Sequence, residues 1–176
     1  MPDVVAGRIP GRILGIDPGS AVTGWGVVEV KGTSHRLIDA GAIVTPDDAL
    51  PERLLAIHRG LQEVIRVTRP AAAAVESLFF AKNVRSAIRL GQARGVALLT
   101  IAEAELPLSE YAPMEIKRAL VGTGRAEKTQ VAHMVRLLLG PSVKALPNRL
   151  DVTDALGVAI CHAHYSAARV KLAGAR

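Results

Sequence analysis

The chain has 176 residues, of which 49% are hydrophobic, and this length fits a single domain with a core of ordinary size. Its 22 lysines and arginines outnumber the 16 aspartates and glutamates, and the net charge of +6 indicates a polyanionic partner such as a nucleic acid. A single cysteine, Cys161, excludes an intramolecular disulfide, and no apolar run has the length of a signal peptide or membrane span, so we expect a cytoplasmic protein without a membrane partner.

The first half of the chain predicts a flexible lead-in followed by strands. Residues 1–11 contain glycine and proline and show no periodic pattern. Short apolar runs separated by turn residues then predict three strands in an antiparallel meander, at residues 12–17, 23–30 and 35–44. Apolar residues recur with a helical period over residues 50–69, and Pro70 ends this helix.

The second half predicts two further strands and four helices. A fourth strand at residues 71–76 closes with an acid, as the first strand does. A long helix, a fifth strand, two short helices and a final helix follow, at residues 84–105, 106–111, 113–120, 127–139 and 150–171. Crossover connections make the fourth and fifth strands parallel to the first. The predicted fold is therefore α/β and ribonuclease H-like, a mixed five-stranded sheet with helices on both faces, in one domain (12–170) followed by a basic tail (171–176).

Four acids are predicted to meet at one edge of this sheet. Asp17 ends the first strand and Glu76 ends the fourth, and neighbouring parallel strands end at the same edge. Asp151 and Asp154 are three residues apart at the start of the last helix, so they share a face. Gathered carboxylates repel one another, and a divalent cation relieves that repulsion. Because all the donors are oxygens, the ion expected is Mg²⁺, or Mn²⁺ in its place.

Each acid also has an ordinary structural interpretation. Asp17 precedes Pro-Gly and could start a turn, and Asp151 could cap a helix. Glu76 is harder to explain in that way, because an acid at the end of a buried strand needs a partner or a function. The joint placement of the acids where strands end favours a catalytic cluster.

Around these acids the sequence resembles the RuvC family. The matching segments occur in the family's order over residues 12–166: Ile13-Leu-Gly-Ile-Asp17-Pro-Gly-Ser, Glu76-Ser-Leu-Phe-Phe-Ala-Lys-Asn83, Leu90-Gly-Gln-Ala-Arg-Gly-Val96 and Asp151-Val-Thr-Asp154-Ala-Leu. The stretch from Tyr111 through Lys117 to Lys128, with its Gly122-Thr-Gly124 loop, is also similar to the family. A longer segment before the first strand is a departure from the family pattern.

The resemblance implies a Holliday junction resolvase that acts in homologous recombination and DNA repair. Such an enzyme is a metal-dependent endonuclease, and it makes symmetric paired nicks across four-way DNA junctions. The resemblance further implies a homodimer, partnership with the RuvA and RuvB branch-migration proteins, and magnesium ions held by Asp17, Glu76, Asp151 and Asp154. Two ions suit an in-line displacement, because one activates water while the other neutralises the leaving oxygen. Asp17, nearest the centre of the sheet edge, is expected to bridge them.

Basic residues near the acids are expected to contact DNA. Lys117 and Lys128 match basic positions of the family near the active site, whereas a surface role and a DNA-binding role are about equally compatible with Arg118 and Arg125. Arg85 and Arg89 are four residues apart and share a helix face, and with Lys82 they are candidate phosphate contacts.

The two phenylalanines follow Glu76 directly. We expect one to lie in the core and the other to meet an unpaired base at the crossover. Position within the motif favours Phe79 over Phe80 for the base.

The helix over residues 84–105 is a candidate subunit interface. It carries four small residues that permit a close approach of helices: Gly91, Ala93, Gly95 and Ala97. Ordinary packing on the sheet explains them nearly as well. A two-fold dimer offers two active sites for two matched nicks, which favours the interface.

Several other functions are less consistent with the sequence. A zinc site at Cys161, His162 and His164 is disfavoured, because residues two apart on a helix point to different sides. A sugar-kinase or actin-like phosphotransferase would need a second phosphate-binding hairpin and a longer chain. An RNA-directed nuclease of the same fold would differ in substrate preference, and a purely structural junction-binding module would not need four intact acids.

Overall fold

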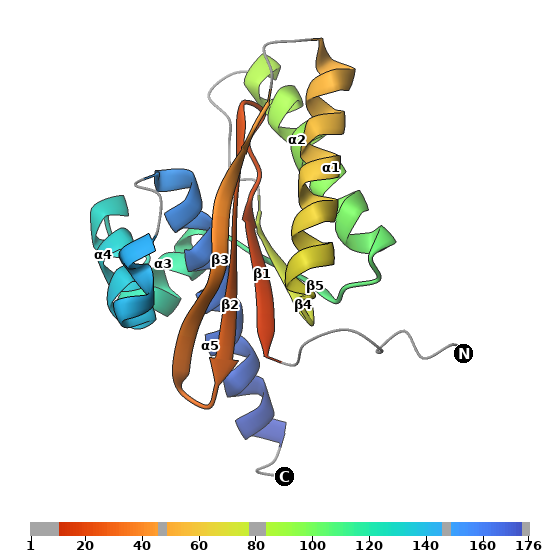
Figure 1. Cartoon of the computed structure of the whole chain (residues 1–176). Helices are drawn as coiled ribbons and strands as arrows, with labels where there is room; N and C mark the ends of the chain where they lie inside the picture. Colours follow the sequence, from red (N-terminus) through yellow and green to blue (C-terminus); the bar gives the residue numbers. More distant parts are fainter. Residues whose placement is uncertain (1–10, 46–48, 78–83, 146–148, 174–176) are drawn as a thin grey trace.

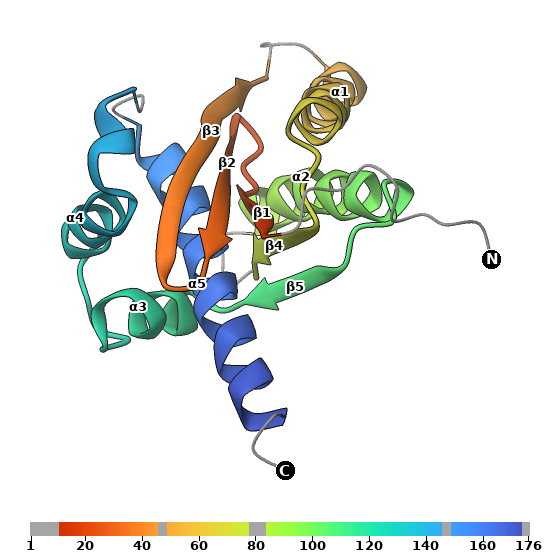
Figure 2. The same ribbon diagram turned by 60° about the horizontal axis from the view of Figure 1, so that its bottom comes forward.

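The computed structural model describes residues 11–45, 49–77, 84–145 and 149–173, and it shows a mixed five-stranded sheet between two layers of helices (Figures 1 and 2). The strands are β1 (Arg12–Asp17), β2 (Val22–Lys31), β3 (Ser34–Val44), β4 (Ala72–Glu76) and β5 (Leu108–Tyr111). Their order across the sheet is β3-β2-β1-β4-β5. The first three strands pair antiparallel, while β4 and β5 run parallel to β1. The predicted α/β fold with a mixed sheet is confirmed.

The helices divide between the two faces of the sheet. They are α1 (Leu50–Thr68), α2 (Val84–Glu103), α3 (Pro113–Val121), α4 (Lys128–Leu139), the 3₁₀ helix η1 (Gly140–Ala145) and α5 (Leu150–Ala173). One face is covered by α1 and α2, and the other by α3, α4 and α5 (Figures 1 and 2). Within the described residues, no helix is both long and apolar enough to cross a membrane.

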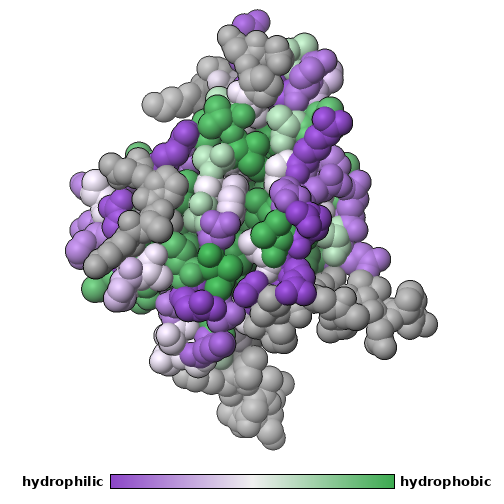
Figure 3. Space-filling view, viewed as in Figure 1, coloured by the Kyte–Doolittle hydropathy of each residue, from purple (hydrophilic) through white to green (hydrophobic). Residues whose placement is uncertain are grey.

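Alternate residues of the central strands supply a separate hydrophobic core on each face. Leu14 and Ile16 of β1 are fully buried with residues of α1 and α2, whereas Ile13 packs with α5 and its neighbours. This alternation is the period-two pattern of a strand that is covered on both sides. The outer strand β3 is only partly covered. In the view of Figure 3, hydrophobic surface lies over the middle of the molecule, while the outer side of α1 is hydrophilic.

Glycines in β1 and β2 allow α5 to lie directly on the sheet. Gly15 pairs with Gly26, and Gly24 pairs with Asp17. A Cβ atom on Gly15 would lie 2.1 Å from the carbonyl oxygen of Ala155, and one on Gly24 would lie 2.1 Å from the carbonyl oxygen of Asp151. Because real Cβ atoms do not approach so closely, only glycine permits this contact. The start of α5 is thereby held next to the end of β1.

The opposite end of the sheet carries a buried carboxylate with cationic partners. Glu29 of β2 is 5% exposed and pairs with Arg12 at 3.4 Å, Lys31 at 3.2 Å and Arg36 at 3.0 Å. Hydrogen bonds from these three side chains, that of Arg36 first, lower the pKa of Glu29 to about 2. Arg12 also donates to the carbonyl of Thr68 at 2.8 Å, which joins the end of α1 to the sheet.

The observed element ends differ from the predicted ones by a few residues. The first helix stops at Thr68, because Arg69 takes a left-handed conformation (φ 48°) and donates its N–H to Ile65. The fifth strand begins at Leu108, two residues later than predicted. The 3₁₀ helix η1 was not predicted, since one short turn has no periodic pattern to identify it.

Replacing Gly24 with alanine is expected to destabilise the fold by roughly 1–3 kcal/mol, the usual cost of overpacking. The new methyl group meets backbone atoms of Asp151, which cannot move away as a flexible side chain does. Urea unfolding measures the effect. Gly124→Ala is the matched control, because a Cβ there lies 3.4 Å from its nearest neighbour, an ordinary contact. Equal stabilities of the two variants would contradict the proposed close packing.

Candidate active site

Two acids lie at the carboxyl ends of neighbouring parallel strands. Asp17 is the last residue of β1, and Glu76 is the last residue of β4. The parallel register pairs Ile16 with Val75, the residues immediately before them. Both carboxylates therefore start from the same level of the same sheet edge, near the centre of the sheet.

The first turn of α5 brings two more acids to this edge. Asp151 lies over Gly24, whose strand partner is Asp17. Asp154 accepts a hydrogen bond at 3.0 Å from Nζ of Lys128, the first residue of α4. Thus β1, β4 and α5 each supply acids, and α4 supplies a cation.

The acids influence one another's protonation. Burial raises the pKa of Asp17 from its ordinary value of 3.8 to about 7. The negative charges of Glu76, Asp154 and Asp151 add to this rise, and Lys128 opposes it. Burial and the charge of Asp154 also raise the pKa of Glu76. The site therefore holds more negative charge than its own lysines neutralise.

A cleft of about 260 Å³ opens beside the acids. It is lined by Glu76 and Asp154 together with Lys117 of α3 and Lys128 of α4. Both lysines lower the pKa of Glu76, so their charges reach the carboxylates. The hydrogen bond to Asp154 raises the pKa of Lys128, which keeps this ammonium charged. The two lysines that sequence motifs singled out therefore stand at the acids.

The donor set suits a divalent cation. Carboxylate oxygens are the ligands that Mg²⁺ prefers, and the mutual repulsion that raises the pKa of Asp17 is the interaction that a cation would relieve. In the part of the chain that the structure describes, no three His, Cys, Asp or Glu side chains form a ready-made metal-binding group. Lys128 instead contacts Asp154, so binding of an ion requires the side chains to rearrange.

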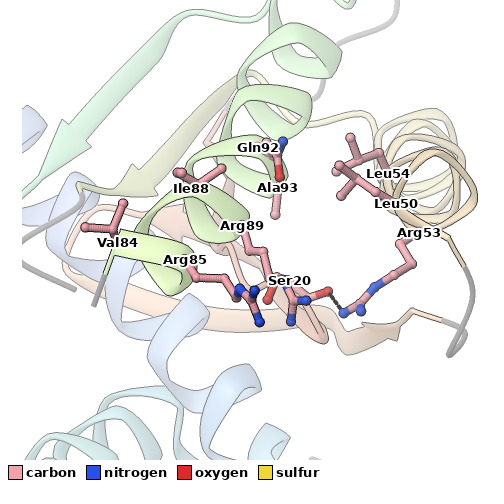
Figure 4. A pocket seen from close by; sticks show the side chains of 10 residues that line it. All are labelled: Ser20, Leu50, Arg53, Leu54, Val84, Arg85, Ile88, Arg89, Gln92 and Ala93. Atoms are coloured by element: carbon pink, nitrogen blue, oxygen red, sulfur yellow. Dashed lines mark hydrogen bonds between the residues drawn. The ribbon is translucent and has the colours of Figure 1, made fainter. Parts of the chain in front are cut away.

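Arg85 and Arg89 lie on α2 and are not among the described residues that line the cleft beside the acids. They line a groove of about 740 Å³ between the first turns of α1 and α2. Figure 4 shows them on α2, across the groove from Arg53 of α1, which donates a hydrogen bond to the carbonyl of Ser20. Ser20 follows Asp17 by three residues, so the groove begins close to the end of β1.

The other predicted residues differ in what can be said of them. Phe79, Phe80 and Lys82 lie outside the described residues. Arg125 is exposed in the loop before α4, where its N–H donates to Oγ1 of Thr123, and Arg118 is in the last turn of α3.

The histidines of α5 have structural partners. Nδ1 of His162 and the hydroxyl of Tyr111 are 2.9 Å apart, and Nδ1 of His164 lies 3.0 Å from the carbonyl of Ala119. Cys161 is fully buried, and burial raises the pKa of its thiol to about 12. These contacts give the two partly buried histidines and the buried Cys161 structural surroundings, on different sides of the helix.

One cation near the acids was missed by the sequence interpretation. Nη2 of Arg149 lies 3.5 Å from Oδ2 of Asp151. Its position two residues before Asp151 was the available signal. The sequence interpretation placed only the motif lysines Lys117 and Lys128 beside the acids and gave no role to Arg149.

These features define a class of protein. A ribonuclease H-like sheet that carries carboxylates at the carboxyl ends of neighbouring strands, with lysines beside them, is the arrangement of a metal-dependent nuclease. A family model described as crossover junction endodeoxyribonuclease RuvC matches residues 13–162. The chain belongs to this RuvC family, whose members are metal-dependent nucleases.

Individual relatives agree with this assignment. Crossover junction endodeoxyribonuclease RuvC of Chloroflexus aurantiacus is 52% identical over 154 residues, which cover 87% of this chain and 93% of that protein. The structure of Thermus thermophilus RuvC in complex with a Holliday junction substrate matches with a TM-score of 0.82 at 41% identity, over 88% of this chain and 94% of the other. The yeast mitochondrial Holliday junction resolvase shares the fold alone, with a TM-score of 0.64 at 14% identity, covering 93% and 82%.

Without metal, Asp17→Asn is expected to stabilise the protein at pH 7–8 by roughly 1–3 kcal/mol, since one pKa unit corresponds to about 1.4 kcal/mol. The pKa of Asp17 is raised to about 7 in the folded state, so the folded chain holds a proton that the unfolded chain releases near 3.8. Stability therefore falls as the pH rises from about 4 to 7, and the loss is complete above 7.

Thermal unfolding in chelator at pH 5 and pH 8 measures this effect. The difference in stability between the variant and the unchanged protein should be larger at pH 8. Asp39→Asn, at an exposed acid of β3, is the control and should show no comparable change. A destabilised Asp17→Asn protein at pH 8 would contradict the assignment of unrelieved repulsion to this site.

Proposed function

We propose that this chain resolves Holliday junctions by making symmetric paired nicks across the four-way junction, as part of DNA recombination and repair. The observation that carries the proposal is the gathering of acids from β1, β4 and α5 at one sheet edge, in a chain that belongs to the RuvC family. The Thermus thermophilus relative, solved with a Holliday junction substrate, supports the choice of DNA substrate. A DNA substrate also favours the cytoplasm as the place of action.

The acids are proposed to hold the catalytic metal, two Mg²⁺ ions for which Mn²⁺ can substitute. The proposed ligands are Asp17, Glu76, Asp151 and Asp154. When bound, the ions supply an activated water and neutralise charge on the leaving oxygen. Asp17 is proposed to bridge the ions, because its strand lies at the centre of the sheet and the charges of all three other acids raise the pKa of its carboxyl group.

The basic residues around the site are proposed to orient the DNA. Lys117 and Lys128 line the cleft with Glu76 and Asp154, where a backbone phosphate would meet both cations and acids. Arg85 and Arg89 are proposed to contact phosphates along the groove at the start of α2. For Phe79 and Lys82, the roles of base and phosphate contacts are carried over from the RuvC motif.

The protein is proposed to act as a homodimer through the outer face of α2. Ala93 and Ala97 are fully buried against the sheet, so these two of the four small residues serve the core. Gly95 is exposed, and a Cβ on Gly91 or Gly95 would meet nothing within 4 Å. Ile88 and Leu99 are 56% and 55% exposed. Ile88, Gly95 and Leu99 follow at spacings of seven and four, which places them on one stripe of the helix. This apolar stripe is suited to a second copy.

RuvA and RuvB are proposed as partners on the basis of the family motifs alone. A junction nuclease needs its crossover brought to a cleavable position, and branch migration supplies that movement.

Cleavage of a synthetic mobile four-way junction with Mg²⁺ tests the function. We expect paired nicks in opposing strands, with no cutting of matched linear duplex or structured RNA. Asp17→Asn should abolish cutting and retain junction binding, because the substitution removes a proposed metal ligand while the basic residues remain. Asp39→Asn should cut normally. Binding of the junction without cutting by the unchanged protein, or preferential cutting of RNA, would contradict the proposal.

Gly95→Leu tests the dimer. A leucine fits on the isolated chain and favours the helix by roughly 0.5–1 kcal/mol over glycine, but it would obstruct a close helix contact. Sedimentation velocity should show a dimer for the unchanged protein and a monomer for the variant, which should make unpaired nicks. Gln62→Leu, on an exposed position of α1, is the control and should remain dimeric. A monomeric unchanged protein at micromolar concentration would contradict this interface.

A further inference from the structure

A second polar cleft opens between α4 and the start of α5, beside the acids. Its volume is about 370 Å³. The polar side chains that line it are Thr129, His133 and Arg136 from α4, and Arg149 and Thr153 from the start of α5 and the residue before it. None of the described residues in this lining is acidic. The two helices lie side by side in both ribbon views (Figures 1 and 2).

The cleft shares its walls with the candidate active site. Lys128 and Asp154 make the 3.0 Å ion pair, and the residues next to them, Thr129 and Thr153, line the second cleft. Arg149 lines the cleft and also lies 3.5 Å from the carboxylate of Asp151. The two clefts therefore lie next to each other along α4 and the start of α5.

The lining is suited to an anion with several oxygens. Arg136 and Arg149 are exposed to solvent, and a guanidinium presents a planar set of donors that matches two oxygens of a phosphate. His133 and Thr129 are also exposed and can add neutral donors. Thr153 is 3% exposed and already donates its hydroxyl to the carbonyl of Arg149 at 3.2 Å, which ties the backbone of Arg149 to the first turn of α5.

We propose that this cleft binds a backbone phosphate of the strand that is cut, a few nucleotides from the phosphate at the acids. The proposal rests on the function proposed above and adds a strand-positioning site formed by His133, Arg136 and Arg149. From Lys128 to Arg136 the helix rises about 12 Å, at 1.5 Å per residue. At roughly 3.4 Å of duplex axis per nucleotide, this distance places the phosphate within about four nucleotides of the acids.

The position of the cleft also explains how a polyanion can approach clustered acids. Arg149 faces the acids on one side and the cleft on the other, so its charge reduces the repulsion of an incoming phosphate. Arg136 extends the positive surface away from the acids along α4. The strand is thereby anchored by cations beside the acids, and no acidic side chain is among the described residues that line the cleft.

Junction binding by Arg136→Gln measures the contribution of the cleft without touching the acids. In chelator, dissociation constants of the full chain are determined for a four-way junction between 50 and 200 mM salt. The slope of log K against log salt should fall by about one, because one phosphate contact is lost. The affinity should fall roughly 10- to 100-fold, as expected for the loss of a charge-assisted hydrogen bond. Arg149→Gln, on the opposite wall, should give the same change.

A scan with neutral methylphosphonates identifies the phosphate. Neutralising one position within about four nucleotides of the nick should weaken binding by the unchanged protein and have no further effect in Arg136→Gln. Arg66→Gln is the control. Arg66 lies on α1, on the opposite face of the sheet from the cleft, and it pairs with Glu63 of the same helix. This control should retain the unchanged protein's response at every position.

The two proposals fail in different ways. If the unchanged protein cuts junctions while both cleft variants keep its salt slope and its methylphosphonate pattern, the cleft is not a phosphate site and the proposed function stands. If the unchanged protein does not cut junctions with Mg²⁺, the proposed function is wrong, and the strand-positioning role is lost with it.

Discussion

The close contact between α5 and the glycines of β1 and β2 is the constraint on which the site depends. With side chains at Gly15 and Gly24, α5 would be pushed away from the sheet, because backbone atoms of Ala155 and Asp151 already occupy the space of a Cβ. The contact carries the acids of α5 to the ends of the parallel strands, where Asp17 stands. Burial of Asp17 at this edge is also the largest cause of its raised pKa. One packing arrangement thus sets both the geometry and the charge balance of the site.

The pKa values of buried acids are shifted in opposite directions at the two ends of the sheet. Glu29 is neutralised by three cationic side chains and has a pKa lowered to about 2, which suits a structural role in joining β1, β2 and β3. Asp17 has a raised pKa. Lys128 opposes this rise, but its ammonium forms its ion pair with Asp154 rather than with Asp17. The buried Glu29 is thus surrounded by cations, whereas the mostly buried Asp17 and Glu76, at the edge where strands end, are only partly neutralised. That contrast supports the assignment of the site to a bound cation rather than to stability.

Much of this was predictable from the sequence, for identifiable reasons. The order of strands and the parallel placement of β4 and β5 followed from apolar periodicity and crossover rules, and Asp17 and Glu76 ended their runs as acids where a core residue was expected. The cations of the second cleft were not predicted, because they belong to different helices and no motif contains them. Thr129, His133 and Arg136 lie along one stripe of α4. That stripe forms one wall of a cleft only because Arg149, directly before α5, lies opposite it. Side-chain pairing such as Lys128 with Asp154 is likewise a tertiary property.

A nuclease of this kind must attract a polyanion to a cluster of acids, and the arrangement of charges resolves the conflict by separation. The acids are partly buried at the sheet edge, where a cation can reach them and where burial raises the pKa of Asp17 and Glu76. The cations stand on helices around that edge: Lys117 on α3, Lys128 and Arg136 on α4, and Arg149 before α5. In the proposed arrangement a strand is bound by its flanking phosphates, and only the phosphate between them needs a bound cation to approach the carboxylates. Removal of a flanking cation should weaken binding, whereas removal of an acid should stop the chemistry, because the two tasks belong to different residues.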